Sequence, residues 1–161
     1  MTKSEFVALR KAEFPKILKL LRLYPEDKKD LRPAPMIRSA IELATVFVNE
    51  EKINFEFATT GKLDMSGGFR STPPASMAEA VAKLEALGAE SEAAFEKLSD
   101  ADFQRQIAAF GIPMSLGDAL LSLLLDHIHH RGQFTIYSRI AGAKVPQIYG
   151  PSADEPWHPP K

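Results

Sequence analysis

The sequence predicts an all-α protein, specifically a four-helix bundle with one long crossover loop. Four long segments carry apolar residues at helical spacing, and no run of alternating residues makes a convincing strand. Residues 61–74 are rich in glycine and proline, lack periodicity, and are long enough to span the end of a bundle. Together these three observations specify a bundle of four helices.

The first predicted helix begins near the N-terminus, where Thr2 and Glu5 fit a capping box. Pro15 interrupts its apolar stripe, which predicts either a kink or a short helix followed by a second one. Residues 24–35 are rich in proline and charge, so we expect a loop there.

The second helix is predicted from about Met36 to Thr59, ending before Gly61. Its apolar residues fall on two arcs, which indicates burial from two directions, such as a bundle core and a subunit interface. Glu50 lies on one arc and Glu51 on the edge of the other. A carboxylate in such a place needs a partner, because burying an unpaired charge is costly. The sequence does not decide which of the two glutamates faces the core.

The third helix is predicted from Ser76, which forms a capping box with Glu79, to about Leu98. Gly88 in its middle costs about 1 kcal/mol relative to alanine and permits a close helix crossing. Residues 100–113 form a mixed connection whose apolar residues we expect to cover the core.

The fourth helix is predicted between Ser115, an N-cap followed by Asp118 in the first turn, and Gly142 at the C-cap. It is apolar on every side, which is typical of a helix buried between others or one that also faces another subunit. The two-sided apolarity of the second and fourth helices predicts a homodimer.

The 161 residues suffice for one domain with a full core. We assign residues 1–143 to the bundle and the proline-rich residues 144–161 to a tail packed on the same domain. A formal net charge of −1 gives no bulk attraction for nucleic acid. The absence of cysteine excludes disulfides, metal sites built from cysteine thiolates and a cysteine nucleophile. No apolar run reaches the roughly 18 residues of a membrane span. We therefore expect a cytoplasmic protein without a nucleic-acid or membrane partner.

Polar residues gather on one face of the fourth helix, where we expect the acid and the imidazole to be enclosed in an apolar interior. They follow one another at steps of four, three and four residues: Asp126, His130, Gln133 and Tyr137. An acid and an imidazole one turn apart can bind one metal ion, although a hydrogen-bonded ion pair is an alternative for the same spacing. His127 and His129 project about 100° away from these neighbours, so we expect them at a rim or interface. Arg131 needs a carboxylate or carbonyl partner.

The segment HHRGQFTIYSRIAG, with Asp126 four residues before His130, resembles the C-terminal helix of the DinB-like family. The following VPQIYGPSADEP is similar to the tail of one branch, and RSAIELATVFVNEE looks like the second-helix motif of the family. The resemblance implies a four-helix bundle, commonly a homodimer. It also implies a divalent metal held by three histidines, one on the second helix and two on the fourth as HxxxH. Family members with known activity include thiol-dependent transferases and isomerases that act with low-molecular-weight thiols.

The sequence departs from that family pattern at two of its three metal-binding positions. His130 occupies the second histidine of HxxxH, whereas Asp126 replaces the first. Val46 falls at or near the expected histidine of the second helix, and Glu50, one turn further on, is the candidate substitute. The resulting set of Glu50, Asp126 and His130 favours harder ions such as Mn²⁺, Fe²⁺ or Zn²⁺, with Ni²⁺ as a further candidate.

Two functions are compatible with these residues. The first is a metal-dependent enzyme, a hydrolase or thiol-dependent transferase, in which the ion activates water or a low-molecular-weight thiol. In that enzyme, Gln133 and Tyr137 are available to orient the substrate. The second is a non-catalytic dimeric bundle, a stress-related or ligand-binding protein with a degenerate metal site. The binding of a metal ion separates the two.

Overall fold

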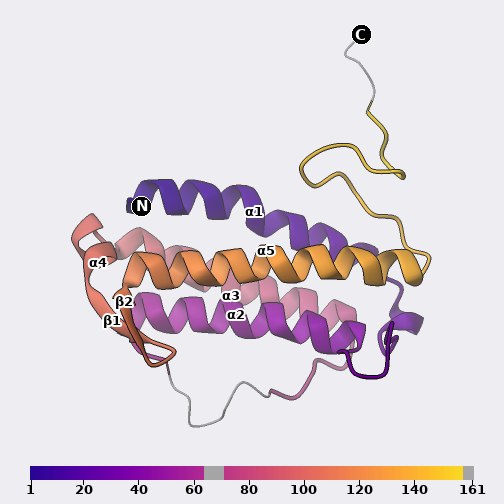
Figure 1. Ribbon diagram of the computed structural model, residues 1–161, viewed down its shortest axis with the longest axis horizontal. Helices are drawn as coiled ribbons and strands as arrows, with labels where there is room; N and C mark the ends of the chain where they lie inside the picture. The colour runs from indigo at the N-terminus through magenta and orange to yellow at the C-terminus, as the bar shows by residue number, and fades with distance from the viewer. Residues whose placement is uncertain (64–70, 158–161) are drawn as a thin grey trace.

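Figure 1 shows a computed structural model of the chain, which describes residues 1–63 and 71–157. Parts of the predicted crossover loop and of the tail lie outside these described residues. Four long helices run side by side, and a short helix and a hairpin lie at one end. The elements are α1 (Lys3–Leu23), η1 (Glu26–Lys28), α2 (Ala40–Thr60), α3 (Met77–Lys97), α4 (Asp100–Gln104), β1 (Gln106–Ala109), β2 (Ile112–Ser115) and α5 (Leu116–Ile140).

The four long helices form a square arrangement, in which α1 packs against α3 and α5, and α2 packs against the same two helices. α2 and α3 run in the same direction, so the connection between them joins opposite ends of the bundle (Figure 1). The prediction of a four-helix bundle with a long crossover is therefore confirmed.

Serine and threonine caps fix where the helices begin. Thr2 forms the predicted capping box with Glu5 at the start of α1. The predicted start of α2 at Met36 is wrong by four residues, because Ser39 and Glu42 form a capping box that begins the helix at Ala40. For α3, the Ser76 hydroxyl accepts from the Glu79 amide at 3.0 Å. The Glu79 carboxylate instead accepts from the Ala75 amide at 2.7 Å, so only half of that predicted box is present.

The middle of α1 crosses α3 closely. The helix continues through Pro15 and bends along its length in Figure 1, so the alternative of two separate helices is wrong. Gly88 of α3 lies against the ring of Phe14, and a methyl group added at Gly88 would overlap that ring. The predicted close crossing at Gly88 is therefore present, and a larger residue there would push α1 and α3 apart.

A β-hairpin between α4 and α5 was not expected from the sequence. β1 pairs with β2 in antiparallel register, with Gln106 opposite Ser115 and Ala109 opposite Ile112. Phe110 and Gly111 form the two-residue turn, with φ of 53° and 78°, as a type I′ turn requires. Strands of four residues are too short to show a clear alternation, which explains why the pattern was missed.

The interior of the bundle is divided by a layer of polar side chains. One apolar cluster contains Phe47 and Phe134, and a second contains Phe6 and Phe57. Between them, each of the four long helices contributes buried polar residues at its middle. We call this set the polar layer: Arg10, Glu13, Glu50, Glu51, Asn54, Ser91, His127 and Arg131.

The chain after α5 turns back toward α1. Val145 is buried, and its amide donates to Asp154 at 2.9 Å. Lys19 of α1 forms an ion pair with Glu155 at 3.2 Å. Among the described residues, no helix combines the length and hydropathy that crossing a membrane would require.

Candidate metal centre

The structure brings the three candidate metal ligands together across the contact between α2 and α5. His130 Nδ1 lies 2.8 Å from Glu50 Oε1 and 3.7 Å from Asp126 Oδ2. One donor atom from each of the three residues lies within 4.8 Å of the other two. We call these three residues the triad.

Local packing holds the imidazoles in place. Asp126 and His130 share one face of α5 because they are one turn apart, and Glu50 reaches them from the neighbouring α2. Phe47, one turn before Glu50, packs its ring edge-on against His127, with centroids 4.9 Å apart, and also against His130. An aromatic ring beside each imidazole restricts its rotation.

The three members of the triad differ in exposure. The Glu50 side chain is 5% exposed and that of His130 is 12% exposed, whereas that of Asp126 is 54% exposed. The expectation that Asp126 is enclosed in an apolar interior is therefore wrong. The face of α5 that meets α2 is occupied by His127 and His130, and Asp126 lies beside that face, at the rim toward solvent.

His127 is the residue whose role the sequence interpretation missed. It was expected at a rim, but it is buried, and its Nδ1 lies 3.3 Å from Glu50 Oε2. The spacing of His127 and His130 contained the signal, because residues i and i+3 are neighbours on a helix surface. His129, by contrast, is exposed, and its Nε2 forms a 2.9 Å hydrogen bond with the Gln133 amide.

Buried polar atoms at this site lack hydrogen-bond partners among the described residues. They are Glu50 Oε2, His127 Nε2 and Asn54 Oδ1. Asn54 and His127 line an internal cavity of about 10 Å³, close to the volume that one water molecule needs. Glu50 Oε2 faces His127 without a well-aligned hydrogen bond, so this carboxylate oxygen is available to a ligand.

The donor set fits a divalent metal ion. Bonds of about 2.0–2.2 Å to nitrogen and oxygen place tetrahedral donors roughly 3.4 Å apart. The 2.8 Å and 3.7 Å separations in the triad bracket that value. Two carboxylates and one imidazole are a mixed oxygen–nitrogen set of the kind that bundle metalloproteins present from facing helices.

Electrostatics at the site favour a charged pair between Glu50 and His130 when no metal is bound. Burial raises the pKa of Glu50, but the contacts with His127 and His130 outweigh it and leave that pKa below its usual value. The hydrogen bond to Glu50 raises the pKa of His130. Burial and the neighbouring charge of Glu50 raise the pKa of Asp126. The contact with Glu50 therefore favours the protonated form of His130, and a metal ion at Nδ1 has to compete with that proton.

Two further pairs of opposite charge lie in the polar layer. Glu51 forms an ion pair with Arg10 of α1, so both glutamates are buried but only Glu50 is left for the histidines. Arg131 has the carboxylate and carbonyl partners that the sequence predicts, since its guanidinium donates to Glu13 Oε2 at 2.6 Å and to the Glu13 carbonyl at 3.1 Å. This pair fixes α5 to α1 one residue away from His130.

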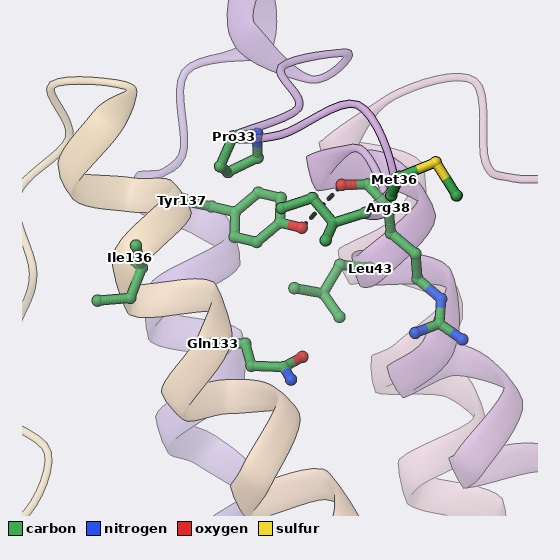
Figure 2. A pocket seen from close by; sticks show the side chains of 8 residues that line it. Pro33, Met36, Arg38, Leu43, Gln133, Ile136 and Tyr137 are labelled. Carbon is green, nitrogen blue, oxygen red and sulfur yellow. Dashed lines mark hydrogen bonds between the residues drawn. The ribbon is translucent and has the colours of Figure 1, made fainter.

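A pocket of about 650 Å³ opens between α5 and the start of α2 (Figure 2). Gln133 and Tyr137, expected to orient a substrate, both line it. The Tyr137 hydroxyl donates to the backbone carbonyl of Arg38 at 2.7 Å, so Tyr137 presents its ring to the pocket and its proton to the backbone.

A helical bundle with carboxylates and an imidazole on facing helices belongs to the architectural class in which metal sites are built into the bundle core. A sequence profile of the DinB family matches residues 61–159 of this chain. The chain belongs to the DinB family. Asp126 and His130 lie within the matched segment, whereas Glu50 precedes it.

One known protein is similar to part of this chain. The uncharacterized protein YrdA of Bacillus subtilis (strain 168) is 42% identical over 57 residues, which are 35% of this chain and 34% of YrdA. The match therefore spans about a third of the length of that relative.

Two solved structures share the fold. A DinB-like protein from Bacillus cereus ATCC 10987 superposes with a TM-score of 0.77 at 24% identity, covering 92% of this chain and 98% of that one. The DinB-like protein YjoA from Bacillus subtilis gives a TM-score of 0.71 at 20% identity, covering 87% and 93%.

Proposed function

We propose that Glu50, Asp126 and His130 hold a divalent metal ion, and that the protein is a metal-dependent enzyme of the hydrolase or thiol-dependent transferase type. The observation that carries this proposal is the approach of one donor atom from each of the three residues to within 4.8 Å of the other two. Zn²⁺, Ni²⁺, Fe²⁺ and Mn²⁺ are the candidate ions.

A divalent ion in the triad would lower the pKa of a coordinated water or thiol toward neutrality. His130 gives up its Nδ1 proton when it becomes a ligand, so binding weakens as the pH falls. His127 Nδ1 lies 3.3 Å from Glu50 Oε2, so His127 limits the positions that this carboxylate can take. Asp126, half exposed, completes the site on the solvent side, where a substrate enters.

Family membership supports a low-molecular-weight thiol as the substrate class. We further assign the chain to the branch of the family with the DxxxHRGQ segment and the YGPSADE tail. A contact supports this pairing of motifs: the hydroxyl of Tyr149, in the tail, bonds to both Arg131, in the first motif, and Glu13. The tail thus fastens the part of α5 that carries His130.

We also propose that the protein forms a homodimer. Its α5 carries three large apolar side chains that are more than half exposed: Leu125, Ile136 and Ile140. A second copy of the chain would cover such a face, and sedimentation at micromolar concentration tests this by distinguishing dimer from monomer.

Metal titration tests the enzymatic proposal. Protein stripped with a chelator is titrated with Zn²⁺ and with Mn²⁺ against a chromophoric competitor. We expect one ion per chain, with affinity reduced at least tenfold in His130→Ala and in Glu50→Gln. His129→Ala, which removes an exposed imidazole next to His130, is the matched control and should bind like the wild type. A chain that takes up no ion under any loading would instead support the non-catalytic dimeric bundle with a degenerate site.

A further inference from the structure

The pocket lies between α5 and the start of α2, farther along both helices than the triad. Gln133 lies one turn after His130 on α5, and Leu43 lies two turns before Glu50 on α2. At 1.5 Å per residue, these positions are about 5 Å and 10 Å along the helix axes from the triad. A volume of about 650 Å³ lies within the range of small-molecule sites.

The lining of the pocket is mostly apolar, with few polar groups. Leu43 forms its floor, and the side chains of Pro33 and Ile136 flank the Tyr137 ring (Figure 2). Burial raises the pKa of Tyr137, and its hydroxyl is already bonded to the backbone. The pocket therefore takes an apolar body, and its polar contacts come from the remaining lining residues.

Arg38 supplies an uncommitted positive charge to this pocket. Its exposed guanidinium makes no hydrogen bond or ion pair with the described part of the chain. Arg32, also near the pocket, is committed, because it donates to Glu42 at 2.6 Å and to the Ile37 carbonyl at 2.7 Å. In Figure 2 the Arg38 side chain lies on the opposite side of the pocket opening from Gln133.

We propose that this pocket binds a small organic carboxylate with an apolar body, its carboxylate paired with Arg38. This proposal rests on the proposed function, because the carboxylate would be the co-substrate that reacts at the triad with the activated water or thiol. Arg38 sets the orientation, because its positive charge attracts the carboxylate to the end of the pocket that lies farther from the triad. Tyr137, which donates to the Arg38 carbonyl, is seven residues after His130, so this end of the pocket is about 10 Å from the triad along the axis of α5.

A matched pair of probes tests the pocket without metal. Phenylbutyrate and phenylbutanol have the same apolar body and differ in charge, and their affinities for metal-free protein are measured by ligand-observed NMR. We expect the wild type to bind the carboxylate roughly tenfold more tightly than the alcohol. Arg38→Gln should lower the affinity for the carboxylate to that of the alcohol. Arg22→Gln, an exposed α1 arginine paired with Glu85, is the matched control and should retain the preference.

A third variant tests the location. Met36 lines the pocket and is 95% exposed, so Met36→Trp should fold normally and weaken both probes. Equal affinity of the two probes for the wild type, or a carboxylate preference that survives in Arg38→Gln, would overturn the proposal. Because these measurements use metal-free protein, a failure here is separate from a failure of the metal titration.

Discussion

The carboxylate of Glu13 is expected to make a large, pH-dependent contribution to stability. Its side chain is 6% exposed. Although burial raises its pKa, hydrogen bonds from Lys16, Tyr149 and Arg131 lower it from 4.5 to about 2. That difference corresponds to about 3 kcal/mol at pH 7. The pKa of Glu13 is lower in the folded protein than in the unfolded chain. Its contribution to stability is therefore complete when the pH is above the unfolded-state pKa, and it is lost as the pH falls toward the folded-state pKa.

Urea unfolding of the wild type and of Glu13→Gln measures this contribution. We expect Glu13→Gln to cost about 3 kcal/mol at pH 7 and only about 1.5 kcal/mol at pH 3, where part of the wild-type advantage has been lost. Glu85→Gln removes an exposed ion-pair partner, so it should change the free energy of unfolding by less than about 1 kcal/mol at either pH. A difference between wild type and Glu13→Gln that is the same at both pH values would refute the reasoning.

Three further substitutions test other parts of the structure. Gly88→Ala should destabilise the fold by about 1–3 kcal/mol in urea unfolding, and adding Phe14→Leu should recover part of that loss. If the changes in the free energy of unfolding of the two single variants simply add in the double variant, the close crossing at Gly88 is contradicted. His127→Ala should weaken Zn²⁺ binding about 10- to 100-fold in the competition titration, and unchanged affinity would remove its positioning role. Tyr149→Phe should lower the free energy of unfolding by about 1–2 kcal/mol, since its hydroxyl bonds within the polar layer; an unchanged value would mean that the tail is not fastened there.

The sequence predicts those features of the fold that depend on local signals. The caps at Thr2 and Ser115 need only residues within one turn, and both are present. The hairpin was missed because its two short strands show no period and its turn, at Phe110 and Gly111, lacks the usual Asn-Gly or Asp-Gly signal. The start of α2 was misplaced because apolar residues before Ser39 extended the helical pattern into the loop.

The candidate site could be predicted in its members but not in its surroundings. Helical spacing places Asp126 and His130 on one face of the fourth helix. Because the second helix is buried, a glutamate on it needs a partner for its charge. The choice between Glu50 and Glu51 depends on Arg10, which comes from a different helix and has no sequence signal for this pairing. The exposure of Asp126 likewise depends on how α5 is rotated against α2, and only the packed bundle fixes that rotation.

The polar layer also explains why the bundle tolerates several charged groups at its centre. Each buried charge has an opposite partner on another long helix, as in the pairs of Arg10 with Glu51 and of Arg131 with Glu13. These pairs link α1 to α2 and α1 to α5, on either side of the triad. A buried pair costs about 3–5 kcal/mol to break by removing one partner, so the helices that carry the triad are held in fixed register.

The central claim is that one divalent ion is held between α2 and α5. Anomalous diffraction from crystals of the protein grown with Zn²⁺ tests it most directly. The account predicts a single strong peak per chain, at about 2.0–2.2 Å from oxygens of Glu50 and Asp126 and from Nδ1 of His130. A peak bound elsewhere, or a His130 Nδ1 that still bonds to Glu50 at saturating Zn²⁺, would contradict it.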